Sequence, residues 1–327
     1  MEASRPGEFE LIARYFAPLA ARFPGAAGLK NDVAVLSVPP GYELAVKTDT
    51  IVAGMHFLPN DPADTIAKKA LRVNLSDLAA AGSAPLAYQM ALSLPKDWTE
   101  AWMGQFVDGL ADDQKIFGVH LCGGDTVATP GPLTVSITAF GLAAIGQAMG
   151  RSGAKPGDDI WVTGTIGDAQ LGLALLQSGL EPLSDAARTY LVDRYRVPQP
   201  RLSLAHHLFT TARATIDVSD GLAADLGHIC TASGVGAVIE AGAVPLSQPA
   251  RELVGRDPSL LASLLTGGDD YEILLTASND MRNAIDILAR QLGFPITRIG
   301  RIVAGNAVNV MRFGTRLGLE RPGFRHF

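Results

Sequence analysis

Apolar and polar residues follow two periods along the first half of the chain, one typical of helices and one typical of strands. The helices predicted in this half cover residues 9–23, 64–81 and 100–117. The strands predicted in it cover residues 33–38, 43–48, 86–94 and 133–142, with the Pro39-Pro40-Gly41 turn between the first two. The first half is therefore expected to form a domain of mixed strands and helices.

A loop at residues 150–158, with three glycines and a proline, separates this pattern from a second one. The helices predicted beyond it cover residues 168–177, 201–211, 221–232 and 281–292. The strands predicted there cover residues 160–163, 215–218, 236–240, 272–276 and 296–302. We expect an α/β protein of the α+β type with two domains, residues 1–148 and 149–327.

Composition narrows the class of protein. Hydrophobic residues make up 47% of the 327 positions and charged residues 18%, which is typical of a globular chain with large cores. The formal charge is −6 and there is no run of Lys or Arg, so we expect no nucleic-acid partner. No stretch approaches the roughly 20 apolar residues of a membrane span, and the N-terminus lacks the apolar core of a signal peptide. We expect a cytoplasmic protein without a membrane partner, in which Cys122 and Cys230 are buried, reduced thiols.

The two commonest nucleotide-binding motifs are missing from the sequence. No G-x-x-x-x-G-K-[ST] occurs, and no G-x-G-x-x-G lies between a predicted strand and helix. A chain of this kind that handles a nucleotide must hold its phosphates by other means, and carboxylates that bind several Mg²⁺ ions are one such means. Mg²⁺ prefers oxygen ligands and is usually held by one or two carboxylates together with substrate phosphates.

Four aspartates in the first half are candidates for such ligands because they stand in apolar surroundings. They are Asp32, Asp49, Asp77 and Asp125. Burying a lone carboxylate is costly unless it is paired or binds a metal. Each of them taken singly has an alternative interpretation as a helix N-cap or a turn residue.

The second half offers a further cluster in residues 215–222, where a predicted strand runs directly into a helix. Asp217 lies near the C-terminal end of the strand, the place where open α/β sheets bind ligands. Ser219 and Asp220 follow at the start of the helix, where free backbone amides favour phosphate. Asp220 is also well placed as an N-cap, which is its structural alternative.

Seven motifs in this sequence resemble those of the thiamine-monophosphate kinase family, which belongs to a superfamily with aminoimidazole ribonucleotide synthetase. They are GEFELI at 7–12, TDTIVAGMHF at 48–57, NLSDLAA at 74–80, GGDT at 123–126, RSGAKPGD at 151–158, IDVSDG at 216–221 and GGDDYE at 267–272. They occur in the family's order and span nearly the whole chain. The resemblance implies a two-domain synthetase-like fold whose N-terminal strands pair in a homodimer.

The resemblance also implies an activity: ATP and thiamine monophosphate give ADP and thiamine diphosphate, with several Mg²⁺ ions and K⁺ as a monovalent cation. The positions that match metal ligands are Asp32, Thr48, Asp49, Asp77, Asp125, Asp217 and Asp220. The positions that match ATP contacts are Phe117, Gly124, Asp125, Arg151 and Ser219. Those that match contacts to thiamine monophosphate are His56, Asp269 and Phe324.

Three positions depart from the family's pattern. Asn31 stands beside Asp32 where the family often has a second acidic residue, Phe117 where a tyrosine is expected, and Asp269 where glutamate is common. The implied mechanism is a direct in-line transfer without a general base, because a phosphate monoester is already largely ionised at pH 7. His56 is interpreted as a phosphate contact, with a hydrogen-bonded core or loop histidine as the alternative.

Two other functions remain open at this point. One is a different ATP-using enzyme of the same superfamily, such as an amide-activating synthetase or selenophosphate synthetase. The segments 55–57 and 269–272 favour the thiamine phosphate acceptor, and neither cysteine lies near the N-terminus as the selenium enzyme requires. The other is a non-catalytic scaffold that binds a nucleotide or metal.

Overall fold

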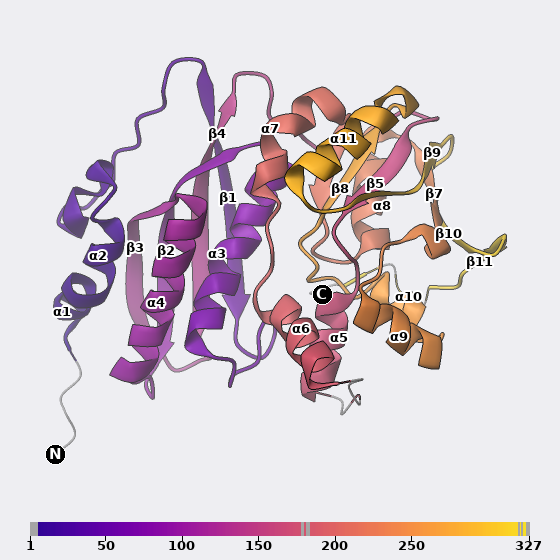
Figure 1. The fold of residues 1–327 in the computed structure, drawn as a ribbon. Coiled ribbons are helices and arrows are strands. Elements are labelled where there is room, and N and C mark those ends of the chain that lie inside the picture. The colour runs from indigo at the N-terminus through magenta and orange to yellow at the C-terminus, as the bar shows by residue number, and fades with distance from the viewer. Residues whose placement is uncertain (1–5, 178–179, 181–183, 320, 322, 325–327) are drawn as a thin grey trace. The chain divides into compact units, whose positions relative to one another are not determined.

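The chain folds into two compact units (Figure 1). A computed structural model describes residues 6–177, 180, 184–319, 321 and 323–324. Unit 1 comprises the chain up to Leu78 together with Ser83–Gly146, and unit 2 comprises Ala79–Gly82 and the chain from Gln147 onward. The expected fold class, α/β with two domains, is confirmed.

Unit 1 is built on a four-stranded sheet in the order β1-β4-β2-β3. Its strands are β1 (Tyr42–Val52), β2 (Ala84–Pro95), β3 (His120–Thr129) and β4 (Thr134–Ala144). The β2/β3 pair is parallel, whereas β4 runs antiparallel to both β1 and β2. Helices α3 (Ala63–Ala80) and α4 (Glu100–Phe117) lie side by side over one face of this sheet (Figure 1).

Helix α4 begins and ends as its sequence predicts. The Thr99 hydroxyl accepts a hydrogen bond from the amide of Trp102 at the start, and Gly118 adopts φ 66° at the end, the left-handed conformation that favours glycine. Between these caps, Met103, Phe106 and Leu110 are fully buried at helical spacing. The other face of the sheet carries no helix comparable to α3 or α4 among the described residues.

Side chains alternate between the two faces along β1. Lys47 and Asp49 lie on the face covered by α3, as their contacts with that helix show. Thr48 and Thr50 lie on the opposite face, where their hydroxyls bond to hydroxyls of β4 at 2.8 Å. Residues adjacent in the sequence of β1 therefore lie on opposite faces of the sheet.

The N-terminal segment differs from its predicted form. The helix expected at residues 9–23 is present as α1 (Glu8–Leu11), a π-helical turn (Ile12–Phe16) and α2 (Ala17–Ala20), followed by a 3₁₀ segment (Pro24–Leu29). The strand expected at residues 33–38 is wrong, because no strand forms there. Val33 and Val35 are 70% and 66% exposed. The segment alternates apolar and polar residues as a strand does, but within the described residues it pairs with no strand.

Unit 2 contains a seven-stranded mixed sheet in the order β11-β10-β7-β9-β5-β8-β6. Its strands are β5 (Asp159–Thr163), β6 (Ala214–Asp217), β7 (Gly236–Glu240), β8 (Ile273–Ala277), β9 (Ile296–Val303), β10 (Val308–Arg312) and β11 (Thr315–Arg316). Its helices are α5 (Asp168–Gln177), α6 (Asp185–Arg196), α7 (Leu202–Thr211), α8 (Leu222–Ser233), α9 (Gln248–Arg256), α10 (Leu260–Leu264) and α11 (Arg282–Leu292).

Two apolar cores hold this second sheet. Leu204 of α7 and Ile285 of α11 pack with Leu275 on one face. Leu226 of α8 packs with Leu274 on the other face, so neighbouring residues of β8 serve opposite cores. The sheet is therefore covered on both faces. The segment that links β6 to α8 begins at the C-terminal end of β6, which is a buried strand.

Two further expectations concern the chain as a whole. Cys122 and Cys230 are free and buried, as predicted, and burial raises the pKa of each thiol to about 11. Within the described ranges, no helix has the length and apolar character needed to cross a membrane.

Candidate functional site

Two of the predicted ligands in unit 1 lie together between β1 and α3. Asp49 projects from β1 and Asp77 from the last turn of α3, and the ammonium of Lys47 lies between them. Lys47 Nζ is 3.1 Å from Asp49 Oδ1 and 3.0 Å from Asp77 Oδ2. The side-chain oxygen of Asn74, which is buried in α3, accepts a hydrogen bond from the amide of Asp49 at 2.9 Å. This hydrogen bond attaches the backbone of β1 at Asp49 to α3.

The charge balance around Asp49 and Asp77 favours a cation. Burial lowers the pKa of Lys47, but the carboxylates of Asp77 and Asp49 outweigh that effect, so the pKa is raised and the ammonium stays charged. Two carboxylates face this one ammonium. The C-terminal end of α3 adds partial negative charge and has no basic residue in its last turn. The oxygens of this pair are of the kind that Mg²⁺ prefers.

A hollow of about 350 Å³ lies on the other face of the unit 1 sheet, between β2, β3, β4 and the N-terminal segment. Asp32, Gly124 and Asp125 all line it, so the structure brings three of the predicted residues together. Thr48 does not line this hollow itself. Its hydroxyl bonds to the hydroxyl of Thr138, which does line the hollow. Asn31 lines it beside Asp32, and both side chains are exposed.

Gly124 is required by the packing of β3 against β2. Its φ is 156°, and a Cβ atom added there would lie 2.0 Å from the carbonyl oxygen of Met90. Asp125 follows in an exposed position, and its Oδ1 accepts the amide of Thr126 at 2.9 Å. The glycine thus lets the strands approach closely where the carboxylate enters the hollow.

Phe117 and His56 lie elsewhere in unit 1. Phe117 ends α4, with the guanidinium of Arg72 at 5.1 Å from its ring centroid, and it does not line the hollow that contains Asp125. His56 lies in the turn after β1, where its Nδ1 accepts the amide of Val52 at 3.1 Å. One ring nitrogen of His56 therefore supports the turn, as the structural alternative expected.

In unit 2 the predicted residues around β6 gather in one loop cluster. Asp217 ends β6 and is 4% exposed. The amide of Asp269 donates to the carbonyl of Ser219 at 2.8 Å, and the amide of Phe324 donates to the carbonyl of Asp220 at 2.9 Å. Segments from three distant parts of the sequence therefore meet, and five predicted residues lie on them.

Strained backbone conformations support the same cluster. Asp269 and Tyr271 have φ of 62° and 50°, and the Tyr271 hydroxyl bonds to Asp269 Oδ1 at 3.1 Å. A Cβ atom at Gly268 would lie 2.3 Å from the carbonyl oxygen of Ser219. Left-handed backbone at residues other than glycine is costly and is concentrated at functional sites. The geometry indicates that the position of Asp269 is tightly determined.

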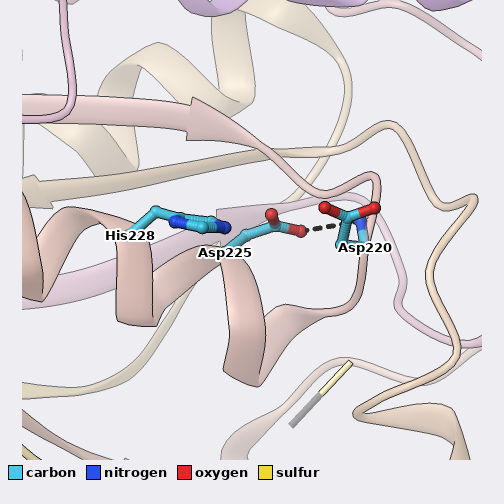
Figure 2. Close-up of side chains that lie close together, drawn as sticks. All are labelled: Asp220, Asp225 and His228. Atoms are coloured by element: carbon cyan, nitrogen blue, oxygen red, sulfur yellow. Dashed lines mark hydrogen bonds between the residues drawn. The ribbon is translucent and has the colours of Figure 1, made fainter. Parts of the chain in front are cut away.

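The alternative interpretation of Asp220, as the N-cap of α8, is wrong. The N-cap of α8 is Gly221, at φ 120°, and no side chain caps it. Instead, Asp225 from the first turn of α8 accepts three consecutive amides with one oxygen, and Figure 2 shows the bond from Asp220. Its Oδ2 lies 3.1, 3.0 and 3.1 Å from the amides of Ser219, Asp220 and Gly221. These amides, expected to be open to phosphate, are already occupied.

Asp225 also shapes the electrostatics of the loop. Burial and, next, the charge of Asp220 raise the pKa of the Asp225 carboxyl to about 7, while the three amides oppose the rise. One ligand atom each from Asp220, Asp225 and the exposed His228 lies within 4.8 Å of the others (Figure 2). This grouping could hold a cation at the end of β6.

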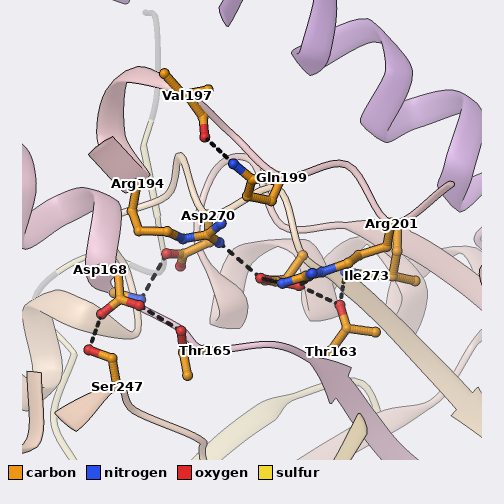
Figure 3. A network of polar contacts seen from close by, with 12 residues as sticks. Thr163, Thr165, Asp168, Arg194, Val197, Gln199, Arg201, Ser247, Asp270 and Ile273 are labelled. Carbon is orange, nitrogen blue, oxygen red and sulfur yellow. Dashed lines mark hydrogen bonds and ion pairs between the residues drawn. The ribbon is translucent and has the colours of Figure 1, made fainter. Parts of the chain in front are cut away.

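The loop of residues 267–272 contributes Asp270 and Glu272 to a network of polar contacts (Figure 3). Glu272 is fully buried, and its carboxylate accepts hydrogen bonds from Arg194 at 2.9 Å, from Arg201 at 2.6 and 2.5 Å, and from the Thr163 hydroxyl at 2.6 Å. Its carbonyl accepts the amide of Val218 at 2.8 Å. Glu272 therefore joins β6, β5 and the arginines on both sides of the 197–200 loop.

Asp270 belongs to the same region. Its Oδ1 accepts the amide of Gly167 at 2.8 Å, whereas its Oδ2 is buried with no hydrogen-bond partner among the described residues. Burial raises the pKa of this carboxyl well above its ordinary value, and the nearby carboxylate of Asp168 adds to the rise. Asp168 is itself held by the hydroxyls of Thr165 and Ser247 (Figure 3).

Arg151 is not part of the loop cluster in unit 2. Its side chain is exposed, and its carbonyl accepts the hydroxyl of Ser233 at the last residue of α8 at 3.3 Å. The 12 residues of α8 span about 18 Å, and Asp220 stands before the other end. Any phosphate contact by Arg151 depends on the reach of its side chain.

Among the residues of these sites, sequence reasoning missed Lys47, Asp225 and His228. Lys47 could have been found from β1 alone, because residues two apart in a strand share a face and Lys47 stands two before Asp49. Asp225 gave a weaker signal, an acidic residue in the first turn of α8. The collection of loop amides by its carboxylate depends on the conformation of the turn.

Two segments of the chain match known protein families. Residues 30–143 match the AIR synthase related protein, N-terminal domain, and residues 155–312 match the corresponding C-terminal domain. The chain is 44% identical over 324 residues to the thiamine-monophosphate kinase of Salmonella typhimurium, covering 98% of each chain.

Solved structures give the same result. The thiamine-monophosphate kinase of Stenotrophomonas maltophilia superposes with a TM-score of 0.80 at 44% identity, covering 86% of this chain and 89% of the other. AaThiL complexed with AMPPCP and TMP superposes with a TM-score of 0.78 at 27% identity, covering 100% of both chains. The chain belongs to the thiamine-monophosphate kinase family.

Proposed function

We propose that this chain transfers the γ-phosphoryl group of ATP to thiamine monophosphate and forms ADP and thiamine diphosphate. The observation that carries the proposal is its 44% identity, over 98% of both chains, to a thiamine-monophosphate kinase. The complex of AaThiL with AMPPCP and TMP supports the same pair of substrates. The clustering of the predicted aspartates within each unit is consistent with this activity.

We assign the metal-binding role to oxygen ligands from both units. They are Asp32, Thr48, Asp49, Asp77, Asp125, Asp217 and Asp220. The fit is supported by the way Asp49 and Asp77 converge on one positive charge, at 3.1 and 3.0 Å from the Lys47 ammonium. Bound Mg²⁺ would neutralise charge on the two phosphate groups and so reduce their repulsion.

The residues of the chain mainly position the reactants, because the transition state of phosphoryl transfer is loose and requires little covalent chemistry. We assign no general base and no phosphorylated residue, since the accepting phosphate is already ionised. The ATP contacts are assigned to Phe117, Gly124, Asp125, Arg151 and Ser219. Gly124 and Asp125 have the best support, since both line the hollow on the unit 1 sheet.

Contacts to thiamine monophosphate are assigned to His56, Asp269 and Phe324. Asp269 is supported by its fixed left-handed backbone, and Phe324 by a side chain that is 44% exposed while its amide is held by Asp220. His56 has one nitrogen engaged with Val52, so a phosphate contact would use Nε2. The shorter side chain of Asp269, compared with the glutamate that is common in the family, requires a closer substrate.

We further propose a homodimer that forms through β1. This strand is at the edge of the unit 1 sheet and pairs only with β4 in the described part of the chain. Tyr42, Leu44 and Val46 are 48%, 36% and 57% exposed along one of its faces. An exposed, apolar edge strand is a template for pairing with another chain. Residues 1–148 would then carry dimerisation and the ATP and metal site, and residues 149–327 the second domain.

The K⁺ requirement and the cytoplasmic location stay predictions. K⁺ can be tested by replacing it with choline in the reaction buffer, where a lower kcat is expected.

The proposed activity is tested by incubating the chain with Mg²⁺, ATP and thiamine monophosphate. Asp125→Ala should lower kcat by about 100-fold or more, the loss typical of removing a charge-stabilising group. Its thermal midpoint without ligands should stay close to wild type, because Asp125 is exposed and bonds only to the adjacent amide among the contacts described. Asp97→Ala, at another exposed position in unit 1, is the matched control. Turnover that requires a different acceptor would contradict the proposal.

A further inference from the structure

Lys47 takes the position that a bound cation would take between Asp49 and Asp77. Its ammonium lies 3.1 Å from one carboxylate and 3.0 Å from the other, so both are within direct ion-pair distance of a single nitrogen. The three side chains are about equally accessible, at 32%, 35% and 23% exposed for Lys47, Asp49 and Asp77. Water and ions can therefore reach the group from solvent.

Lys47, Asp49 and Asp77 together carry a net negative charge. Lys47 supplies one positive charge against two carboxylates, and the C-terminal end of α3 adds partial negative charge beside Asp77. The remaining charge attracts a divalent cation. However, a divalent cation bound to the same oxygens would lie within a few ångströms of the ammonium and be repelled by it.

The lysine side chain can move to relieve this conflict. Its charge is carried on a flexible four-carbon stem with freely rotating bonds, unlike the planar fork of an arginine. The carboxylates are less free, because Asn74 fixes the amide of Asp49 and the helix fixes the backbone of Asp77. Displacement of Lys47 therefore costs less than rearrangement of the two aspartates.

We propose that Lys47 is a resident counter-ion that keeps Asp49 and Asp77 together in the absence of metal and competes with Mg²⁺ for them. The inference rests on the proposed function in one respect, the assignment of Asp49 and Asp77 as metal ligands. It adds a determinant of metal affinity: the chain sets its Mg²⁺ requirement through a side chain that must leave before the metal binds.

The test compares Lys47→Met, which keeps the length of the stem without the charge, with wild type. Mg²⁺ alone is titrated into the full chain by isothermal titration calorimetry, without nucleotide or acceptor. Loss of one positive charge at this distance should tighten Mg²⁺ binding about tenfold. The thermal midpoint of the variant should be lower than wild type without Mg²⁺ and should rise more steeply with Mg²⁺ concentration.

Two matched variants control for other effects of the substitution. Lys47→Arg keeps the charge and should leave the Mg²⁺ affinity within about twofold of wild type or weaken it. Lys68→Met removes another lysine of unit 1 that lies between two aspartates, Asp64 and Asp112, which have no assigned metal role. Its Mg²⁺ affinity should equal that of wild type.

Unchanged or weaker Mg²⁺ binding by Lys47→Met would overturn the proposal, and so would a tenfold gain shared by Lys68→Met. A lower kcat for Lys47→Met at saturating Mg²⁺, with unchanged Mg²⁺ affinity, would also overturn it, because the ammonium would then serve the phosphates. The titration contains no substrate, so its result is independent of which acceptor is phosphorylated. Failure of the proposed kinase activity would be recognised separately, in the product assay with wild type.

Discussion

Replacing Asp225 by alanine should destabilise the loop that carries two predicted metal ligands. One oxygen of this buried carboxylate accepts the amides of Ser219, Asp220 and Gly221 at 3.0 to 3.1 Å. The Gly221 bond is buried, and the other two are partly buried. The substitution therefore leaves one donor without access to water and exposes two to partial hydration.

The magnitude follows from these burial differences. Leaving a buried donor unsatisfied costs about 1–3 kcal/mol, and each of the two outer hydrogen bonds contributes about 0.5–1.5 kcal/mol. Water replaces part of the two outer bonds, so we expect a total loss of about 3–5 kcal/mol for Asp225→Ala. At roughly 2–4 °C per kcal/mol for a domain of this size, the thermal midpoint should fall by about 10 °C.

The assay is calorimetric unfolding at pH 5, below the raised pKa of about 7, because the ionised Asp225 carboxyl stabilises the folded chain less as pH rises. Asp225→Asn keeps an acceptor oxygen and should lose about half as much stability. Asp286→Ala, at an exposed position on α11, is the control and should change stability by less than about 0.5 kcal/mol. At a temperature where Asp225→Ala is folded, kcat should still fall. A free energy of unfolding equal to wild type would refute the role of this carboxylate in the loop.

Two further substitutions test other parts of the account. Burial raises the pKa of Asp270, so its contribution to stability is complete below the unfolded pKa of about 4 and is lost as pH rises through the folded value. Asp270→Asn, which does not titrate, should gain thermal midpoint relative to wild type between pH 5 and pH 8 in differential scanning fluorimetry; a constant difference would contradict this. Gly124→Ala would place a Cβ atom 2.0 Å from the Met90 carbonyl oxygen and should raise the KM for ATP at least tenfold or lower the thermal midpoint. Gly104→Ala has open space around it and should do neither, and equal effects of the two alanines would contradict the packing argument.

The sequence predicted elements best where one apolar pattern coincided with clear caps. Helix α4 was predicted with its observed bounds from helical spacing, and in the structure Thr99 caps its start and Gly118 its end. Strand β3 was missed, since Gly123 and Gly124 interrupt its alternation. Residues 33–38 show the opposite error, because alternation indicates which side chains can share a face and does not supply a neighbouring strand.

The candidate site shows the same limit. Motif order identified the aspartates, and the structure then placed Asp49 and Asp77 around one ammonium and Asp32 and Asp125 in the lining of one hollow. The carboxylate of Asp225, which holds the loop amides, could not be predicted from its position, because the bonds depend on a turn closed by Gly221 at φ 120°. Local sequence patterns indicate which side chains can bind a metal ion or a phosphate. Tertiary contacts determine which backbone amides are already hydrogen-bonded within the chain.

Direct transfer to thiamine monophosphate can be tested by following the γ-phosphoryl group of labelled ATP in a reaction with thiamine monophosphate and Mg²⁺. We expect the label to appear in thiamine diphosphate, with one ADP formed for each product molecule, and the protein recovered after one turnover to carry none. Label retained on the protein would contradict the direct transfer. ATP consumption that yields labelled inorganic phosphate and no thiamine diphosphate would contradict the proposed function itself.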